Sequence, residues 1–241
     1  VCFTRVGAYI YATNATVVDV TVPDKPINYA SLKDAVEQST NTLKQYIFEI
    51  FADQVIGENN VVEIKNKQNI IITRQKDSSA RIYRKASYTG SMFVVKGTLS
   101  LNYNIEEITY RESVESLDIF GSNESGESSQ KVDATEAILR IEKNGSLSVF
   151  EGVTIQNGTN STTNGGAVYI QDSESIFNMF SGTIKNCSAV NGGAIAVMAG
   201  TAQIISGVLS DNNAVNGGAI YSQGAVNVGS DSSITLLSEN I

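Results

Sequence analysis

Basic side chains gather in one segment of the chain. Between residues 65 and 96 the sequence has eight Lys and Arg residues but a single acidic residue, Asp77. Alternation places four of them, Lys65, Lys67, Arg74 and Lys76, around one pair of predicted strands, so several of them could contact one chain of sulfates or carboxylates. The segment therefore predicts a binding patch for an anionic glycan; a solvated face is the alternative.

Two tyrosines offer a second kind of binding chemistry. Tyr169 and Tyr221 occupy the same position in two copies of a repeated motif, with Ala196 at that position in the copy between them. Tyrosines spaced in this way can stack on sugar rings and leave their hydroxyl groups available for hydrogen bonds. Tyrosine is also a common residue of ordinary β-strands, which is the alternative interpretation.

The residues that catalysis would need are not found together. The chain has no His, which excludes a Ser-His-Asp triad and leaves Cys187 without a base. Asp172 and Glu174 alternate as the two carboxylates of a glycoside hydrolase would, but Ser-rich sequence around them indicates a solvated turn. No Lys or Arg follows Lys185, so the C-terminal part offers no base for a polysaccharide lyase. We therefore predict no catalytic residue, no metal site and no cofactor.

A repeat indicates which elements position these side chains. The motif Asn-Gly-Gly-Ala followed by an aliphatic residue occurs at 164–168, 191–195 and 216–220, with spacings of 27 and 25 residues. A period of this length is typical of stacked-repeat proteins. The Gly pair permits a turn with positive φ or a close pass of the backbone.

Each repeat reads as three short strands and three turns. Alternation places Val168, Ile195 and Ile220 on an inward face, where they would stack on one another, and places Ala194 and Ala196 on the outward face. The sequence predicts an all-β chain that folds as a right-handed parallel β-helix. A leucine-rich repeat is the alternative for this period, but Leu is sparse and the Gly pair would break its helix.

Two other features divide the chain. Ser31 to Glu37 is predicted to form a short helix, with Ser31 as N-cap and Asp34 at the capping-box position, covering the open end of the column. We expect an N-terminal segment with this helix at residues 1–45, followed by a β-helix at 46–241. Residues 106–136 carry nine acidic residues, and their stretch 121–129 lacks apolar residues, which predicts a long mobile acidic loop.

The repeated Gly-Gly-Ala-Ile/Val motif resembles the repeat of the chlamydial-type polymorphic outer membrane proteins. That family pairs GGA[ILV] with a short FxxN motif. Here the first half matches three times, Thr183 stands in place of the Phe before Asn186, and Leu209 with Asn212 is the nearest fit in the next copy. The clear resemblance covers residues 150–222. It implies a right-handed β-helix, placement outside the cell and a role in adhesion.

Composition limits the partners. The net charge of the 241-residue chain is −8, which argues against general binding of nucleic acid. No apolar run is long enough for a membrane span. Val6 to Ala12 reads either as the tail of a secretion signal or as an edge strand.

Two cysteines, Cys2 and Cys187, do not make a disulfide framework. Six Asn-X-Ser/Thr sequons occur, at residues 14, 123, 144, 157, 160 and 186. They would be glycosylated in a eukaryotic secreted chain, but chance is the stronger explanation in a repeat rich in Asn, Ser and Thr.

Together these features predict a non-catalytic, adhesin-like protein of the cell surface. It would present a binding surface to a glycan or a protein on another cell or surface. The alternatives are a polysaccharide lyase or hydrolase on the same fold and a structural spacer without a ligand.

Overall fold

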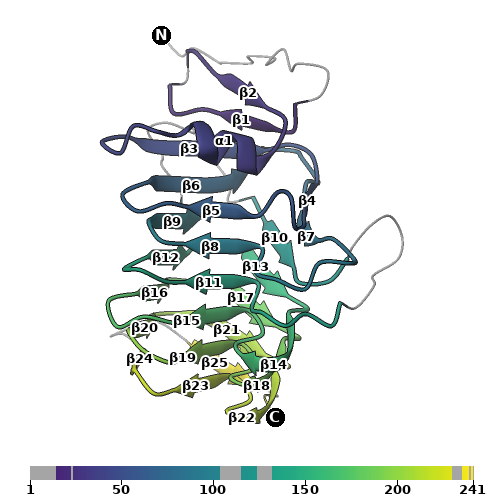
Figure 1. Cartoon of the computed structure of the whole chain (residues 1–241), viewed down its shortest axis with the longest axis vertical. Helices are drawn as coiled ribbons and strands as arrows, with labels where there is room; N and C mark the ends of the chain where they lie inside the picture. Colours follow the sequence, from purple (N-terminus) through teal and green to yellow (C-terminus); the bar gives the residue numbers. More distant parts are fainter. Residues whose placement is uncertain are drawn as a thin grey trace.

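The structure is a computed structural model that describes residues 15–22, 24–103, 115–123, 132–229, 235–238 and 240. Within those residues the chain is mostly β-strand, with one seven-residue helix, α1 (Leu32–Gln38). Three long sheets, named A, B and C here, run along the molecule, and the chain visits them repeatedly in that order (Figure 1). The predicted all-β class with parallel strands is confirmed, and the arrangement is compatible with a parallel β-helix.

Sheet A is the longest of the three and contains both kinds of strand pairing. From β3 to β24 its strands pair in parallel, whereas β1 pairs antiparallel with both β2 and β3. The sequence did not predict this antiparallel start. The order across the sheet is β2 (Ile27–Tyr29), β1 (Val17–Asp19), β3 (Gln45–Ile50), β6 (Asn69–Arg74), β9 (Thr98–Leu101), β12 (Ser146–Val149), β16 (Ile176–Met179), β20 (Thr201–Ile204) and β24 (Ala225–Val228).

Sheets B and C are parallel throughout their described strands. Sheet B runs β4 (Gln54–Ile56), β7 (Ile82–Arg84), β10 (Leu117–Phe120), β13 (Val153–Gln156), β17 (Thr183–Lys185), β21 (Gly207–Ser210) and β25 (Thr235–Ser238). Sheet C runs β5 (Val62–Ile64), β8 (Phe93–Val95), β11 (Leu139–Ile141), β15 (Val168–Ile170), β19 (Ile195–Val197) and β23 (Ile220–Ser222).

A short fourth sheet lies between sheets B and C in the later circuits of the chain. Its strands β14 (Thr159–Asn164), β18 (Ser188–Asn191) and β22 (Asn213–Asn216) end at the Asn of each Asn-Gly-Gly motif. These Asn side chains form a ladder, in which Nδ2 of Asn191 donates to Oδ1 of Asn164 at 2.9 Å and Nδ2 of Asn216 donates to Oδ1 of Asn191 at 2.8 Å. This extra strand is a departure from the predicted three strands per repeat.

The predicted apolar stack is confirmed on sheet C. Val168 pairs with Ile195 and Ile195 pairs with Ile220. The first two side chains are fully buried, and Ile220 packs partly buried against the same core cluster. Ala194, predicted to face outward, is instead part of that core, because the chain turns at the Gly pair and strict alternation begins only after it.

The two glycines of the motif have different roles. The first, as in Gly192, has a φ of +66°, and Gly165 and Gly217 have nearly the same value. The second, Gly193, has no room for a side chain, because a Cβ there would lie 2.2 Å from the carbonyl oxygen of Gly218 in the next circuit. Both functions that the sequence suggested for the Gly pair, positive φ and a close pass of backbone, are therefore present.

We expect Gly193→Ala to lower the free energy of unfolding by about 1–3 kcal/mol, since overpacking against backbone forces neighbouring circuits apart. Gly57→Ala is the matched control: the three atoms nearest to its Cβ would all belong to the flexible side chain of Lys85, so its effect should stay within about 1 kcal/mol. Urea titrations of both variants measure the difference. Equal midpoints would contradict the close pass at Gly193.

Helix α1 begins as the sequence predicted. Oγ of Ser31 accepts from the backbone N–H of Asp34 at 3.2 Å and its hydroxyl donates to Oδ2 of Asp34 at 2.8 Å. Two glutamines bind the helix ends: Oε1 of Gln54, in β4, accepts from the N–H of Leu32, and Nε2 of Gln68, just before β6, donates to the carbonyl of Val36. The apolar side of the helix is part of the main core cluster.

The predicted acidic loop at 106–136 is wrong for its middle part. Leu117–Phe120 forms strand β10, which pairs in parallel with β7 and β13 and buries Leu117 and Ile119 in the core. The alternation Leu-Asp-Ile-Phe is a normal strand pattern that the acidic composition around it obscured. Residues 104–114 and 124–131 lie outside the described residues, as do 1–14 with the segment Val6 to Ala12.

A turn that follows sheet B contains the buried thiol. Cys187 is a free cysteine, and burial raises the pKa of its thiol to about 12. Its N–H donates to Oδ1 of Asn212 at 3.0 Å in the next circuit. Ile184 pairs with Leu209 in the strand register, so the residue equivalent to Asn212 in the previous circuit is Cys187. The comparison with the FxxN motif had instead aligned Asn186 with Asn212.

Candidate functional site

The outer face of sheet C carries one continuous line of outward side chains. The middle residue of each strand faces outward, and strand register sets these residues side by side. We call this row the sheet C line; from the N-terminal end it comprises Glu63, Val94, Arg140, Tyr169, Ala196 and Tyr221. It brings together residues from distant parts of the sequence.

Both predicted tyrosines belong to this line. Tyr169 and Tyr221 flank Ala196 in the paired strands and are each partly exposed. Two strand spacings put their backbones roughly 10 Å apart. Ala196 faces outward as predicted and lies outside the core cluster, yet it is fully buried.

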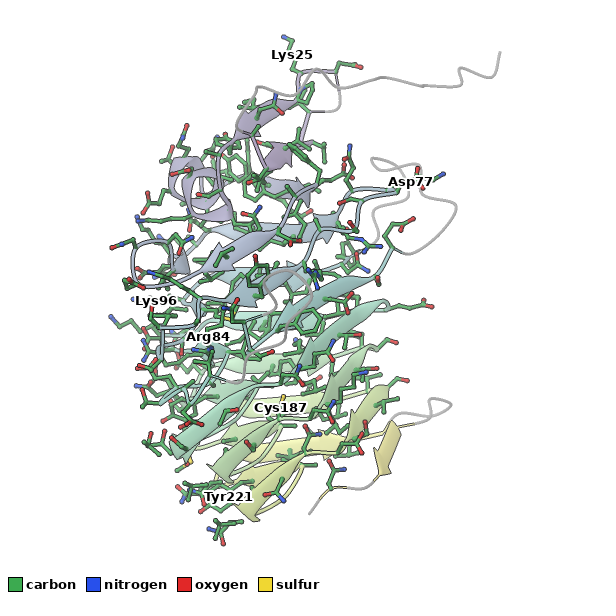
Figure 2. All side chains as sticks on the ribbon, turned by 90° about the vertical axis from the view of Figure 1, so that its right-hand side faces the viewer. Lys25, Asp77, Arg84, Lys96, Cys187 and Tyr221 are labelled. Atoms are coloured by element: carbon green, nitrogen blue, oxygen red, sulfur yellow. The ribbon has the colours of Figure 1, made fainter. Side chains whose placement is uncertain are left out.

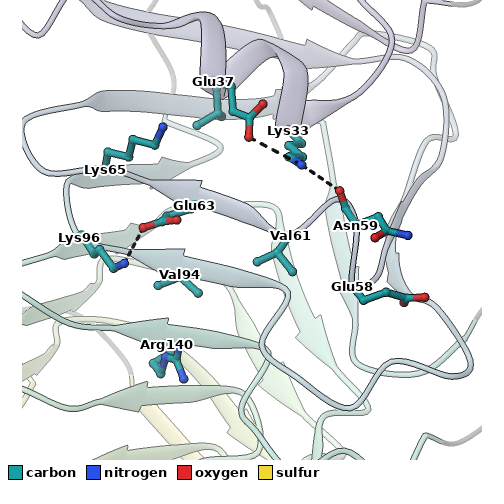
Figure 3. Close-up of a pocket in the computed structure, with 11 residues that line it drawn as sticks. Lys33, Glu37, Glu58, Asn59, Val61, Glu63, Lys65, Val94, Lys96 and Arg140 are labelled. Carbon is teal, nitrogen blue, oxygen red and sulfur yellow. Dashed lines mark hydrogen bonds and ion pairs between the residues drawn. The ribbon is translucent and has the colours of Figure 1, made fainter.

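A cavity of about 340 Å³ lies at the other end of the sheet C line, beside α1 (Figure 3). Helix α1, the segment before β5, and strands β5, β8 and β11 all contribute to it. Valines and charged side chains share its surface. Its lining residues are Lys33, Val36, Glu37, Glu58, Asn59, Val61, Glu63, Lys65, Val94, Lys96 and Arg140.

Ion pairs connect the charged groups around this cavity. Nζ of Lys96 contacts Glu63 and lies 3.3 Å from Oε1 of Glu142. The hydrogen bond with Glu63 is the main cause that raises the pKa of Lys96. Nη1 of Arg140 lies 3.0 Å from Oε2 of Glu136, and its Nε lies 3.7 Å from Oε2 of Glu142. These contacts join side chains from neighbouring circuits into one network.

Lys65 has a different position in the same cavity. It is exposed, and it makes no ion pair with any residue that the structure describes. It follows β5 as Lys96 follows β8, so the two lysines come from neighbouring strands. Of the four predicted cationic residues, Lys65 is the one that the structure places in this cavity.

The other three predicted cations lie elsewhere. Lys67 is in the turn that precedes β6 and has a φ of 68°. Arg74 ends β6 and pairs with Glu115 at 3.3 Å, and Lys76 follows in the next turn. Asp77, next to Lys76, lies on the opposite side of the molecule from Lys96 in Figure 2. Strand β6 therefore separates the four residues into two groups.

The basic segment is also largely neutralised. Arg81 pairs with Asp53 at 3.5 Å, and Lys85 pairs with Glu58 at 2.7 Å. Those acids, like Glu63 and Glu115, come from outside residues 65–96. Counting charges within residues 65–96 overlooked these acidic partners, because they are close in space but lie outside that segment of the sequence.

Arg84 is the largest correction to the predicted basic segment. It is fully buried at the end of β7. Its guanidinium donates to the carbonyl of Gly121 at 3.0 Å, to the carbonyl of Gly90, and to that of Glu136 at 3.5 Å. Burial lowers its pKa to about 10, so the group remains charged at neutral pH. Arg84 ties separate segments together and offers nothing to an external ligand.

The carboxylates that a hydrolase would need lie in a turn between β15 and β16. Glu174 is exposed and Asp172 is half-buried, and Oδ2 of Asp172 accepts from the backbone N–H of Lys143 at 2.6 Å. The predicted solvated turn is confirmed. Over the described part of the chain, no three His, Cys, Asp or Glu side chains gather in a way that could hold a metal ion.

Sequence reasoning counted Lys96 only as a member of the basic segment, outside the four residues singled out, and it did not assign Arg140 to a site. A signal for Lys96 was present, because Val62-Glu63-Ile64-Lys65 and Phe93-Val94-Val95-Lys96 share one alternation. Each ends in an outward lysine after two inward residues. No such signal pointed to Arg140, whose place beside Val94 depends on strand register across the acidic segment.

Comparisons with protein-family models, with curated proteins and with solved structures gave no match to this chain. In the residues that the structure describes, no helix has the length and apolar character that crossing a membrane requires.

Proposed function

We propose that this chain is a non-catalytic, adhesin-like binding domain of a cell-surface protein and that it binds glycan along the sheet C line. The observation that carries the proposal is the register of sheet C, which puts Tyr169 and Tyr221 in one row with Arg140 and the cavity beside α1. A row of this kind offers stacking surfaces and polar groups along a path that an extended oligosaccharide can follow.

The fold that we propose for it is a right-handed parallel β-helix with α1 covering its N-terminal end. Support for the winding is the repeated order A, B, C with parallel pairing at each circuit. Parallel strands joined by crossovers within a sheet are right-handed in nearly all proteins. Support for the cap is the burial of Leu32, Ala35 and Val36 within the main core cluster.

The resemblance to the polymorphic outer membrane protein repeat supports placement outside the cell. The Gly pair that carries the resemblance has a clear structural role here, because each of its glycines meets a separate backbone requirement. The rigid stacked column would hold the sheet C line at a fixed orientation away from the cell.

Binding of immobilised oligosaccharides tests the proposal. We expect the double variant Tyr169→Ala, Tyr221→Ala to lose at least about fivefold in affinity, since two stacking contacts of about 0.5–1.5 kcal/mol each are removed. Tyr103→Ala is the matched control, because Tyr103 is an exposed tyrosine that follows strand β9 of sheet A and packs on Phe150. Unchanged binding in the double variant would refute the sheet C line as the glycan site.

A further inference from the structure

We propose that the cavity beside α1 accepts an uncharged pyranose unit and discriminates against a sulfated or carboxylated one. The inference rests on the proposed glycan-binding function and specifies the ligand of that site. It departs from the anionic glycan that the basic segment predicted, because the structure pairs those basic groups with acids.

The charges around the cavity are balanced. Among the described residues, the lining groups and their ion-pair partners comprise five cations and five carboxylates, so their formal charges cancel. The cations are Lys33, Lys65, Lys85, Lys96 and Arg140, and the carboxylates are Glu37, Glu58, Glu63, Glu136 and Glu142. A balanced cavity attracts an anion only weakly over distance.

The cations that a sulfate would need are engaged. Lys96 already contacts Glu63 and Glu142, and Arg140 contacts Glu136. A bound sulfate would compete with these carboxylates and lie close to them. Lys65 alone offers an ammonium group without a described ion-pair partner, and a single exposed ion pair adds little affinity in water.

A sugar hydroxyl group suits the same surroundings. Each hydroxyl both donates and accepts a hydrogen bond, so it can bridge a lysine donor and a carboxylate acceptor without breaking their pairing. Hydrogen-bond donors and acceptors lie next to one another around the cavity. Nζ of Lys33, for example, donates to the carbonyl of Asn59 at 2.9 Å and lies 3.7 Å from Oε1 of Glu37. Hydroxyl groups on several carbons of one ring could be satisfied together.

Apolar surface in the cavity matches the C–H face of a pyranose ring. Val61 and Val94 lie among the charged side chains that line it (Figure 3). Val94 is an outward residue of the sheet C line and pairs with Arg140, which in turn pairs with Tyr169. A sugar unit held over Val94 therefore has a path toward the tyrosines. The volume of about 340 Å³ is within the range of small-molecule sites.

The probes are neutral hexose oligomers of cellulose, starch, mannan and galactan type and a sulfated form of each, measured by calorimetry on the full chain. We expect at least one neutral oligomer to bind more tightly than its sulfated form. Its affinity should change by less than about threefold between low and physiological salt. Lys76→Glu, at an exposed turn position outside the cavity, is the charge control and should likewise leave it within about threefold.

A blocking variant locates the ligand. Val94→Arg places a long side chain in the cavity, and we expect at least about tenfold weaker binding of the neutral oligomer. Ser148→Arg is the control, at an outward position on sheet A. If Val94→Arg fails to fold, Glu58→Ala, an exposed lining position, is expected to weaken the same oligomer by at least about threefold.

The outcomes separate the two proposals. Preference for the sulfated forms, with a steep loss of binding on adding salt or in Lys65→Glu, would overturn the uncharged ligand while leaving binding through the tyrosines intact. Neutral binding that Val94→Arg and Glu58→Ala leave unchanged would overturn the cavity as its site. Absence of binding by every oligomer would overturn the proposed function and this inference with it.

Discussion

Arg84→Met is expected to lower the free energy of unfolding by about 3–6 kcal/mol. The guanidinium donates to three backbone carbonyls, from Gly90, Gly121 and Glu136. A methionine of similar length fills the space but leaves those acceptors without a donor, and each unsatisfied buried group costs about 1–3 kcal/mol. Urea titration followed by circular dichroism measures the change. Arg84→Lys should not restore stability, since one ammonium group cannot reproduce the guanidinium fork.

Arg81→Met is the control for this prediction. Arg81 precedes the same strand, β7, and its pairing with Asp53 involves two side chains that are about a third exposed. Loss of such a pair should lower the free energy of unfolding by only about 0–1 kcal/mol. Should Arg84→Met be as stable as Arg81→Met, the burial and bonding of Arg84 described above would be incorrect.

Ile195→Ala is expected to lower the free energy of unfolding by about 2–5 kcal/mol, because it removes a fully buried branched side chain and leaves a cavity. Ile195 lies between Val168 and Ile220 in the sheet C register, so neighbours above and below lose contacts as well. A stacked column cannot collapse easily onto the gap, since backbone hydrogen bonds fix the spacing between circuits.

Val215→Ala serves as the control, since Val215 is 80 % exposed on β22. Its substitution should change stability by less than about 0.5 kcal/mol. A similar denaturation midpoint for the two variants would contradict the inward facing of Ile195. The pair therefore tests the core assignment independently of any ligand.

The sequence by itself determined the repeating part of the fold. Alternation identified Val168, Ile195 and Ile220 as one inward row, because a strand with one buried face must present apolar residues at every second position. The Gly pair predicted a special backbone conformation, because glycine alone tolerates positive φ and a close pass at no steric cost. Ser31 with Asp34 predicted the start of α1, since N-capping depends on residues that are neighbours in sequence.

The sequence was a poorer guide where local composition and register disagree. Strand β10 lies inside a segment whose acidic residues suggested a loop, although Leu117 and Ile119 face the core. The antiparallel pairing of β1 with β3 has no local signature, because pairing direction depends on which edge of the sheet is available. The strands of the short fourth sheet were missed because the Asn ladder that joins them forms only between circuits.

Only the tertiary structure decided which charged groups of the candidate site are paired with one another. Lys96 pairs with Glu63 and Glu142, and these partners come from strands β5 and the end of β11, 33 and 46 positions away along the chain. Arg84 became a buried hydrogen-bond donor for the same reason, since two of its three acceptors, the carbonyls of Gly121 and Glu136, lie in the next circuit. Opposite charges cancel according to distance in space, and a winding chain places residues of neighbouring circuits closer together than those at the two ends of one strand.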